Sequence, residues 1–200
     1  SSDLLASKAA LDIIKKGNID PLKIDLIIVA TATPDCISPS TACSVQAFIG
    51  AKNAVAFDIN AACSGFVFGL SVADKFIKSG VYQNAIVIGA EVISKHVDWT
   101  DRTTCVLFGD GAAGAYLERS DKPGIIAEDI GCDGSRGMCL TGGKNTPSNV
   151  FNEIEKEKNV YIFMDGKEVF DFATRQVPKS ASKVMNETNL TKDDIKDRKS

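Results

Sequence analysis

The sequence predicts an α/β protein with a largely parallel sheet. Residues 26–30 and 85–89 form continuous apolar runs of strand length, as expected for strands that are covered on both faces. Around these runs, apolar residues recur every three or four positions, which is the period of a helix. Strands that alternate with helices favour parallel pairing, and we expect the later strands to turn antiparallel.

The first fifty residues contain two predicted helices and a buried strand. We expect a helix at 1–17, a strand at 26–30, a loop at 31–39 and a helix at 40–49. Leu4, Leu11 and Ile14 lie on one side of the first helix, which the Gly17-Asn18 pair ends.

Residues 55–80 are the stretch around which the rest of the chain is organised. Residues 55–59 form a short apolar run that predicts a buried strand, interrupted only by Asp58. After Cys63 the apolar period changes from that of a strand to that of a helix. The residues on the predicted apolar face of this helix are Phe66, Leu70, Ala73 and Ile77. Cys63 should therefore lie between the end of a strand and the first turn of a helix.

The second half of the chain is less regular. We expect strands at 85–89, 106–108, 112–117, 124–130 and 160–164, and a helix at 167–188. Residues 109–111 should form the turn between two of these strands, and Pro178 should break or kink the helix. Residues 131–152 are rich in Gly, Ser, Thr and Asn and are the best candidate for a mobile connection, whereas the charge run at 153–158 predicts a solvated turn.

Composition excludes several function classes. The chain has 200 residues, 44% hydrophobic and 24% charged, which are globular values. A net charge of −3 argues against a general nucleic-acid binder. No apolar run approaches the ~20 residues that a membrane span needs, and residues 1–17 lack a signal-peptide pattern.

Six cysteines raise the question of disulfides or zinc. They are Cys36, Cys43, Cys63, Cys105, Cys132 and Cys139. Their spacings include no Cys-x-x-Cys pair or comparable zinc motif, so we expect no metal site. Reduced thiols in a cytoplasmic protein are the preferred interpretation.

Cys63 is the candidate nucleophile. The N-terminus of a helix carries roughly +0.5 elementary charge and unpaired N–H groups, which stabilise a nearby thiolate. Its small neighbours leave room for a substrate carbonyl, and the N–H of Cys63 could help to hold an oxyanion. From the residues alone, a buried structural cysteine remains an equal alternative.

The residues around Cys63 read DINAACSGF, which resembles the nucleophile motif of the beta-ketoacyl-ACP synthase III family. Further segments resemble this family in the same order: LSVADKFIKSG, NAIVIGAEV, DWTDRTTCVLFGDGAAGAYL, DGS and MDGKEVFDFA. The resemblance covers nearly the whole chain. It implies a thiolase-like fold with αβα layers and a mixed, largely parallel sheet. It also implies a first half at 1–152 that carries the nucleophile, and the start of a second half at 153–200.

The resemblance also assigns substrate-binding residues. Arg102 matches an arginine that contacts the adenine end of coenzyme A; an ion pair with Asp98 or Asp101 is the alternative from the residues alone. Further matching positions border the acyl pocket, although their apolar character would otherwise assign them to the core: Leu107, Met164 and Phe170.

Ile37 matches a position that, in the family, reaches across a homodimer interface and closes the partner's pocket. Many relatives carry an aromatic residue there. The smaller Ile37 therefore leaves room for a branched or longer primer.

Two other motifs call for interpretation. His96 is the only histidine and could form a pair with Cys63. The family places its catalytic histidine elsewhere, so we expect an exposed loop histidine without a catalytic role. Residues 109–114 read GDGAAG, like a dinucleotide-binding loop, but residues of strand type follow them and no helix does. We therefore expect a tightly packed turn there.

The implied function of a complete protein is that of an acyltransferase in fatty acid biosynthesis. Cys63 would take a short acyl group from acyl-CoA, and condensation with malonyl-ACP would give 3-ketoacyl-ACP. The implied partners are acyl-CoA, acyl carrier protein and a second copy of the chain in a cytoplasmic homodimer. No nucleic acid, membrane, metal or cofactor is implied.

The chain departs from the family at both ends. The family's catalytic histidine and asparagine lie in a Pro-His-Gln-Ala-Asn-type segment, whereas residues 193–200 read DDIKDRKS. The opening strand and the aromatic residue that faces Arg102 across the adenine are also missing. We therefore expect a fragment that carries the nucleophile but does not condense. The alternatives are another thiolase-fold condensing enzyme of hydroxymethylglutaryl-CoA or polyketide type, a cysteine hydrolase, or a non-catalytic fragment.

Overall fold

The computed structural model describes residues 1–122, 124–142 and 161–195. It divides into two compact units. Unit 1 comprises Ser1–Ile93 and Gly109–Ile125, and unit 2 comprises Ser94–Phe108 and Ile126–Ser200. The predicted boundary between residues 152 and 153 and the charge run at 153–158 lie outside the described residues.

Unit 1 is built on a four-stranded sheet with the order β2-β1-β3-β4. The strands are β1 (Leu26–Ala30), β2 (Val55–Ile59), β3 (Asn84–Val92) and β4 (Asp110–Glu118). β1 pairs in parallel with both β2 and β3, and β4 runs antiparallel to β3 from Asp110 to Glu118. The predicted sheet, parallel at first and antiparallel later, is therefore confirmed.

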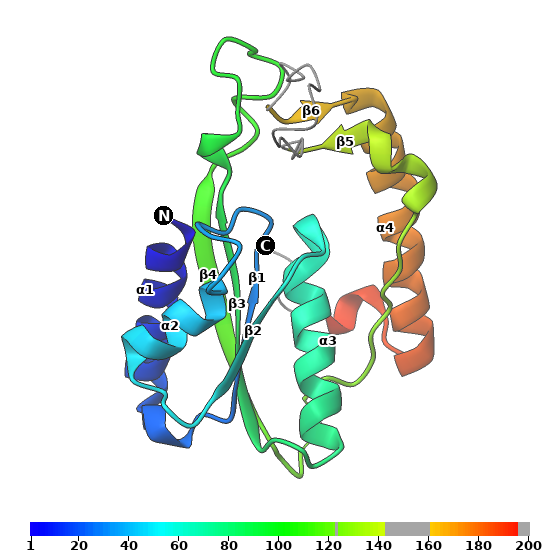
Figure 1. Ribbon diagram of the computed structural model, residues 1–200. Coiled ribbons are helices and arrows are strands. Elements are labelled where there is room, and N and C mark those ends of the chain that lie inside the picture. The colour runs from blue at the N-terminus through cyan, green and yellow to red at the C-terminus, as the bar shows by residue number, and fades with distance from the viewer. Residues whose placement is uncertain (123, 143–160, 196–200) are drawn as a thin grey trace, which may run out of the picture. The chain divides into compact units, whose positions relative to one another are not determined.

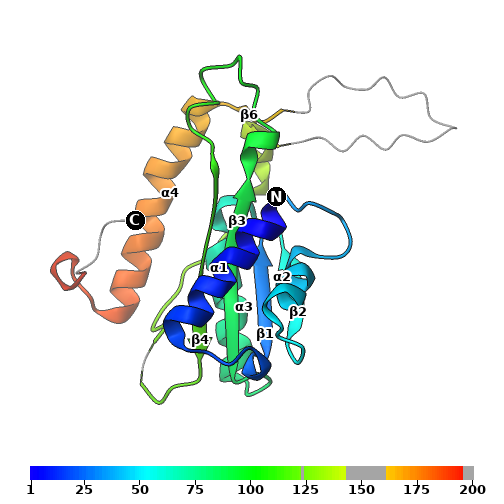
Figure 2. The same cartoon turned by 90° about the vertical axis from the view of Figure 1, so that its left-hand side faces the viewer.

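Helices cover both faces of this sheet (Figures 1 and 2). α1 (Ser2–Gly17) and α2 (Thr41–Ile49) lie on one face, and α3 (Gly65–Lys78) lies on the other. Alternate residues of β1 face opposite ways: Ile27 and Val29 pack towards α1 and α2, whereas Leu26 and Ile28 pack towards α3. Unit 1 thus has the expected αβα layers and a hydrophobic core on each side of the sheet.

The helix α1 buries small side chains. Ala6 and Ala10 are fully buried against the sheet and α2, whereas Leu4 is exposed. Leu11 and Ile14 are half-buried and pack against this core. Of the three larger residues expected on one side of α1, two therefore contact the core and Leu4 does not.

The edge strand β2 differs from its prediction as a buried strand. Within the described ranges β2 pairs with β1 alone, and its residues are exposed or half-buried, with Val55 47% exposed. The apolar run was correctly placed, but its composition does not show how many neighbours the strand has.

Three predicted elements after residue 100 are wrong. Residues 106 and 107 lie in a series of turns, residue 108 has no regular structure, and residues 124–130 form no strand. Residues 109–111 are not a turn between strands, because β4 already begins at Asp110. Val106 and Leu107 are strand-forming types that are exposed, so no neighbouring strand or core selects an extended conformation for them.

Unit 2 contains a long helix and little core. Its regular elements are η4 (Gly134–Cys139), β5 (Leu140–Thr141), β6 (Phe163–Met164), α4 (Gly166–Thr188) and η5 (Lys192–Asp194). α4 continues through Pro178 and is therefore not broken there. The expected mobile connection is regular at 134–141, and its residues 143–152 lie outside the description. In the part of unit 2 that the structure describes, only Val97 and Thr104 are buried. The helices of the described ranges are too short or too polar to cross a membrane.

Glycines bring α3 against the sheet. A Cβ atom on Gly69 would lie 2.8 Å from Cγ1 of Val87, and one on Gly65 would lie 3.0 Å from the Cβ atom of Ala30. Both separations are closer than ordinary van der Waals contact. Only hydrogen at these two positions allows α3 to lie this close to β1 and β3.

Replacing Gly69 should therefore destabilise unit 1. We expect Gly69→Val to lower the free energy of unfolding by about 2 kcal/mol, because the added methyl groups overpack the contact with Val87. Chemical denaturation measures this change. Gly111→Val is the matched control, since no atom lies within 4 Å of its added Cβ, and it should shift stability by no more than about 0.5 kcal/mol. Equal stability of the two variants would contradict the packing argument.

Candidate functional site

Cys63 lies where β2 gives way to α3. β2 ends at Ile59, a short 3-10 turn η2 (Ala62–Ser64) follows, and α3 begins at Gly65. The Cys63 side chain is exposed. The position predicted from the sequence is therefore confirmed, and the alternative of a buried structural cysteine does not hold.

The backbone before Cys63 is in a left-handed conformation. Ala62 has φ 46°, a value that is uncommon for a residue with a side chain. Residues held in such conformations concentrate at functional sites. The sharp turn at Ala62 presents the next residue, Cys63, at the exposed start of α3.

Hydrogen bonds close this turn on either side of Cys63. The Ser64 N–H donates to the carbonyl of Ala61 at 3.2 Å, and the Gly65 N–H donates to the carbonyl of Ala62. The Cys63 N–H lies inside this turn, directly before α3, next to where an oxyanion would form beside the thiol.

Asp58 fixes the end of β2. Its carboxylate accepts hydrogen bonds from the N–H groups of Thr41 at 2.8 Å and Ala42 at 2.7 Å, which open α2. The Ile59 carbonyl also accepts from the N–H of Thr31 at 3.1 Å. A carboxylate at a helix N-terminus is favoured by the helix dipole. The hydrogen bonds of Asp58 to α2 therefore fix the end of the strand that leads to Cys63. From the sequence, Asp58 was only an interruption of an apolar run.

Ile37 is completely exposed, at 100% of its surface. The loop that carries it is anchored at its base, where Glu91 accepts hydrogen bonds from the Ala32 N–H at 2.8 Å and the Thr33 hydroxyl at 2.6 Å. A fixed base with an exposed apolar residue beyond it is compatible with the expected contact with a second copy of the chain.

Arg102 is exposed in unit 2, in a loop stabilised by its own aspartates. Asp98 accepts from Thr100, and Asp101 accepts from Thr103 and Thr104; these hydrogen bonds lower the pKa of both carboxyl groups. Within the described residues, Arg102 forms no ion pair with either aspartate. The structure therefore does not support the alternative of a paired surface arginine.

The predicted pocket residues also lie in unit 2 and are largely exposed. Leu107 is 61% exposed and Phe170 70%, whereas Met164 is half-buried. Their apolar character alone would have assigned Leu107 and Phe170 to the core. The structure shows that they are not core residues. The loop with Arg102 and Leu107 is joined to the segment before β6 by a 2.8 Å hydrogen bond from the Ile162 N–H to the carbonyl of His96. His96 itself is half-buried and not fully exposed as expected.

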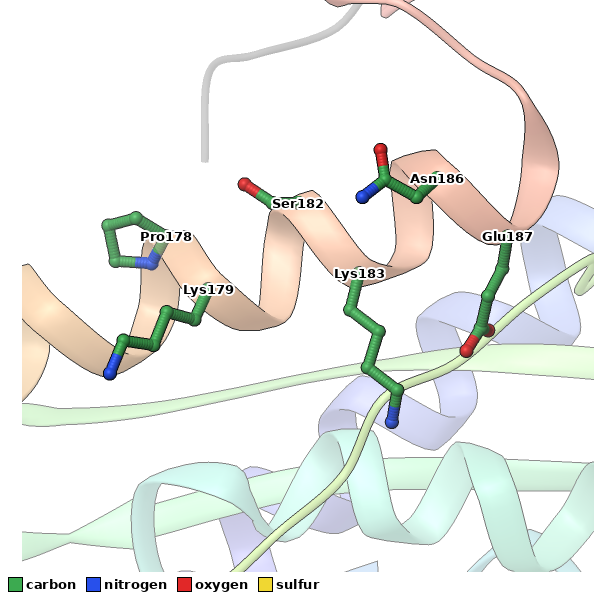
Figure 3. Close-up of a pocket in the computed structure, with 6 residues that line it drawn as sticks. All are labelled: Pro178, Lys179, Ser182, Lys183, Asn186 and Glu187. Carbon is green, nitrogen blue, oxygen red and sulfur yellow. The ribbon is translucent and has the colours of Figure 1, made fainter.

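Two pockets are formed by described residues, and neither is lined by a predicted site residue. One lies along the second half of α4 and is lined by Pro178, Lys179, Ser182, Lys183, Asn186 and Glu187 (Figure 3). Lys183 extends from it to Asp129, and their hydrogen bond lowers the pKa of Asp129 and raises that of Lys183. A cavity in unit 1 lies beside the second half of α3, between Leu70 and Lys78. In the described residues, no group of three or more His, Cys, Asp or Glu side chains is placed to bind a metal.

Comparison with known proteins shows the fold and the family that the chain resembles. Residues 57–134 match the family model described as 3-Oxoacyl-[acyl-carrier-protein (ACP)] synthase III. The beta-ketoacyl-[acyl-carrier-protein] synthase III of Streptococcus mutans is 53% identical over 186 residues, which are 93% of this chain and 57% of that protein. The crystal structure of the synthase III of Aquifex aeolicus has a TM-score of 0.85 and 41% identity, covering 96% of this chain and 58% of its own.

The fold, with an exposed thiol where β2 leads into α3, is that of a thiolase-like protein. More narrowly, the chain is similar to the beta-ketoacyl-ACP synthases III, the family that its sequence resembles. It spans about 57–60% of the length of the curated relatives that it matches. A priming beta-ketosynthase of the R1128 polyketide pathway also shares the fold, with a TM-score of 0.86 and 30% identity over 96% of this chain and 57% of its own.

The contact between Asp58 and α2 can be tested by substitution. We expect Asp58→Ala to lower the free energy of unfolding by about 1–2 kcal/mol, because two N–H groups at the start of α2 lose their acceptor. Asp58→Asn keeps one acceptor oxygen and should fall between alanine and wild type. Denaturant titration of the three proteins provides the measurement. An alanine variant as stable as wild type would show that solvent replaces the carboxylate without loss.

Proposed function

We propose that the protein is an acyltransferase that takes a short acyl group from acyl-CoA onto Cys63. The observation that carries this proposal is the exposed Cys63 thiol at the start of α3, after a left-handed residue and among small neighbours. The similarity to beta-ketoacyl-ACP synthases III supports the choice of a CoA thioester as the acyl donor.

The loading step is a thioester exchange. The Cys63 thiolate attacks the carbonyl carbon of the acyl thioester, and the carbonyl oxygen becomes an oxyanion near the Cys63 N–H. The bond from the carbon to the CoA sulfur then breaks, and the CoA thiolate leaves and takes up a proton. The acyl group remains as a thioester on Sγ of Cys63. The step needs no metal or cofactor, and a cytoplasmic location fits the acyl-CoA and acyl carrier protein that it requires.

The second step of the proposed reaction is condensation with malonyl-ACP. Decarboxylation of the malonyl group breaks a carbon–carbon bond and releases CO₂, and the resulting enolate carbon attacks the acyl carbonyl. Cys63 leaves as a thiolate, and the product is 3-ketoacyl-ACP. Residues 1–200 contain no counterpart of the family's histidine and asparagine, and His96 is the only histidine. We therefore propose that these 200 residues by themselves load but do not condense.

The acyl chain would contact apolar side chains from two copies of the chain. Leu107, Met164 and Phe170 would border the pocket, and the exposure of Leu107 and Phe170 leaves these two side chains available for this role. Ile37 would close the pocket of the partner in a homodimer, and its full exposure supports this assignment. Since isoleucine is smaller than an aromatic residue, a branched primer such as isobutyryl-CoA should be accepted.

Intact-mass analysis after incubation with acetyl-CoA tests the loading step. We expect the mass to rise by one acetyl group, and peptide mapping should place that group on Cys63. Cys63→Ser should abolish the adduct. Cys43→Ser is the matched control and should leave it unchanged, because Cys43 is half-buried on α2. Wild-type protein that stays unmodified would refute the proposed function, as would an adduct confined to other cysteines.

Loading from isobutyryl-CoA, measured in a parallel experiment, tests the proposed role of Ile37. A rate of loading similar to that of acetyl-CoA would support an open pocket. Strict preference for acetyl-CoA would remove the proposal of a branched primer while leaving acyl transfer itself intact.

Arg102 can be tested by removing the nucleotide from the substrate. We expect Arg102→Gln to weaken the apparent affinity for acetyl-CoA by about fivefold, because a cation that stacks on the base and attracts phosphate is lost. Loading from acetyl-pantetheine, which has no adenine, should not change. The control Lys179→Gln, on α4, should affect neither substrate. An equal loss with both donors would show that Arg102 does not recognise the nucleotide.

A polyketide-priming ketosynthase is the second candidate. It is favoured by the 30% identity to the priming enzyme of the R1128 pathway. Both candidates use the Cys63 loading step, so they differ in primer and in the carrier protein that receives the product. The likeness to MvaS, at 19% identity, shows the fold alone.

A further inference from the structure

In unit 2, Arg136 is surrounded by three carboxylates. Its Nε atom lies 3.4 Å from Oδ2 of Asp133, and its Nη1 atom lies 3.7 Å from Oε2 of Glu168 and 3.9 Å from Oδ2 of Asp171. Asp133 begins η4, the turn that carries Arg136, whereas Glu168 and Asp171 lie in the first two turns of α4. Arg136 therefore links two segments that are about thirty residues apart in the chain.

Among the described residues, the start of α4 has few other contacts. β5 and β6 pair over two residues each, Leu140 with Met164 and Thr141 with Phe163. The Asp165 N–H donates to the carbonyl of Cys139 at 2.8 Å, and the Asp165 carboxylate caps α4. Neither η4 nor the described length of α4 contains a buried residue. The position of this helix start thus depends on polar contacts and not on a hydrophobic core.

The geometry of Arg136 suits a link between segments. An isolated ion pair between exposed groups changes a population by no more than about fivefold, but here one planar guanidinium faces three carboxylates. The Nη1 atom is buried and has no hydrogen-bond partner among the described residues. Partial removal from water strengthens its attraction to the two α4 carboxylates. Arg175, by contrast, contacts Asp171 at 2.7 Å from within α4 itself and has no ion pair with a second segment among the residues that the structure describes.

We propose that Arg136 is a positioning residue that holds β6 and the start of α4, and with them Met164 and Phe170, at the acyl pocket. This inference rests on the proposed function, which assigns these two apolar residues to that pocket. Phe170 lies on α4 between Glu168 and Asp171, and Met164 lies on β6 just before the helix. Arg136 therefore acts on the acyl chain indirectly, through the segment that its ion pairs fix.

The first test measures the segment without any substrate. Hydrogen exchange, followed by mass spectrometry, should show residues 163–175 exchanging about fivefold faster in Arg136→Gln than in wild type. Raising the salt from 0.1 M to 1 M shortens the screening length from about 10 Å to about 3 Å. We expect this to speed exchange in wild type and to have little effect in Arg136→Gln. Arg136→Lys should restore part of the protection, and Arg175→Gln should leave β6 unchanged.

The second test measures selectivity. The rate of loading onto Cys63 is compared for acyl-CoAs of increasing chain length. Arg136→Gln should alter the ratio of long-chain to short-chain rates by about fivefold, with a smaller effect on acetyl-CoA, and Arg136→Lys should return the ratio towards that of wild type. A purely structural loss would lower all rates together.

The outcomes separate this inference from the proposed function. If wild type is not acylated by any donor, the proposed function fails, while hydrogen exchange still decides whether Arg136 fixes the segment. Unchanged exchange at residues 163–175 in Arg136→Gln would overturn the inference. If both wild type and Arg136→Gln are acylated and their ratios of long-chain to short-chain loading rates are equal, the inference is also overturned.

Discussion

The position of the Cys63 thiol depends on how closely α3 approaches the sheet. Gly65 and Gly69 bring the helix within a distance that no side chain at these positions would allow. On the other face, the Asp58 carboxylate fixes the end of β2 to the first turn of α2. Because β2 and α3 are both fixed, the chain must pass from one to the other within a single tight turn, residues 60–64. The conformation at Ala62 and the exposure of Cys63 follow from that restriction.

The sequence was sufficient to predict the fold wherever burial is dense. β1 is buried along its whole length, and the unbroken apolar run at 26–30 predicted it as a strand covered on both faces. The same reasoning failed where apolar residues lack neighbours. Val106 and Leu107 have the composition of a strand but are exposed, and β2 was expected to be covered although it lies at the edge. The period of apolar residues indicates which secondary structure a segment prefers. Whether that segment is paired and buried depends on which other parts of the chain lie beside it.

The candidate site was predictable to the extent that its geometry is local. Cys63 was located because the change of period that signals the strand-to-helix junction occurs within a few residues of it. Asp58 and Arg136 were not recognised, because their partners lie 16 or more residues away in α2 and about thirty residues away in α4. A single charged residue in a strand or a turn gives no sign of which distant N–H or carboxylate it will meet. Arg102 was found only through the family resemblance, since its own loop offers no periodic signal.

The two units differ in the forces that hold them, and this difference suits the proposed chemistry. A nucleophile must be held in place, and Cys63 belongs to the unit with a core on both faces of its sheet. The residues assigned to the acyl chain and to coenzyme A belong to the unit with little core, where ion pairs and helix caps define the local structure. Groups that contact a flexible chain can tolerate adjustment that an attacking sulfur cannot. In such a unit a weak interaction has a larger structural effect than in a packed core, because little apolar burial among its described residues opposes the movement that its loss permits.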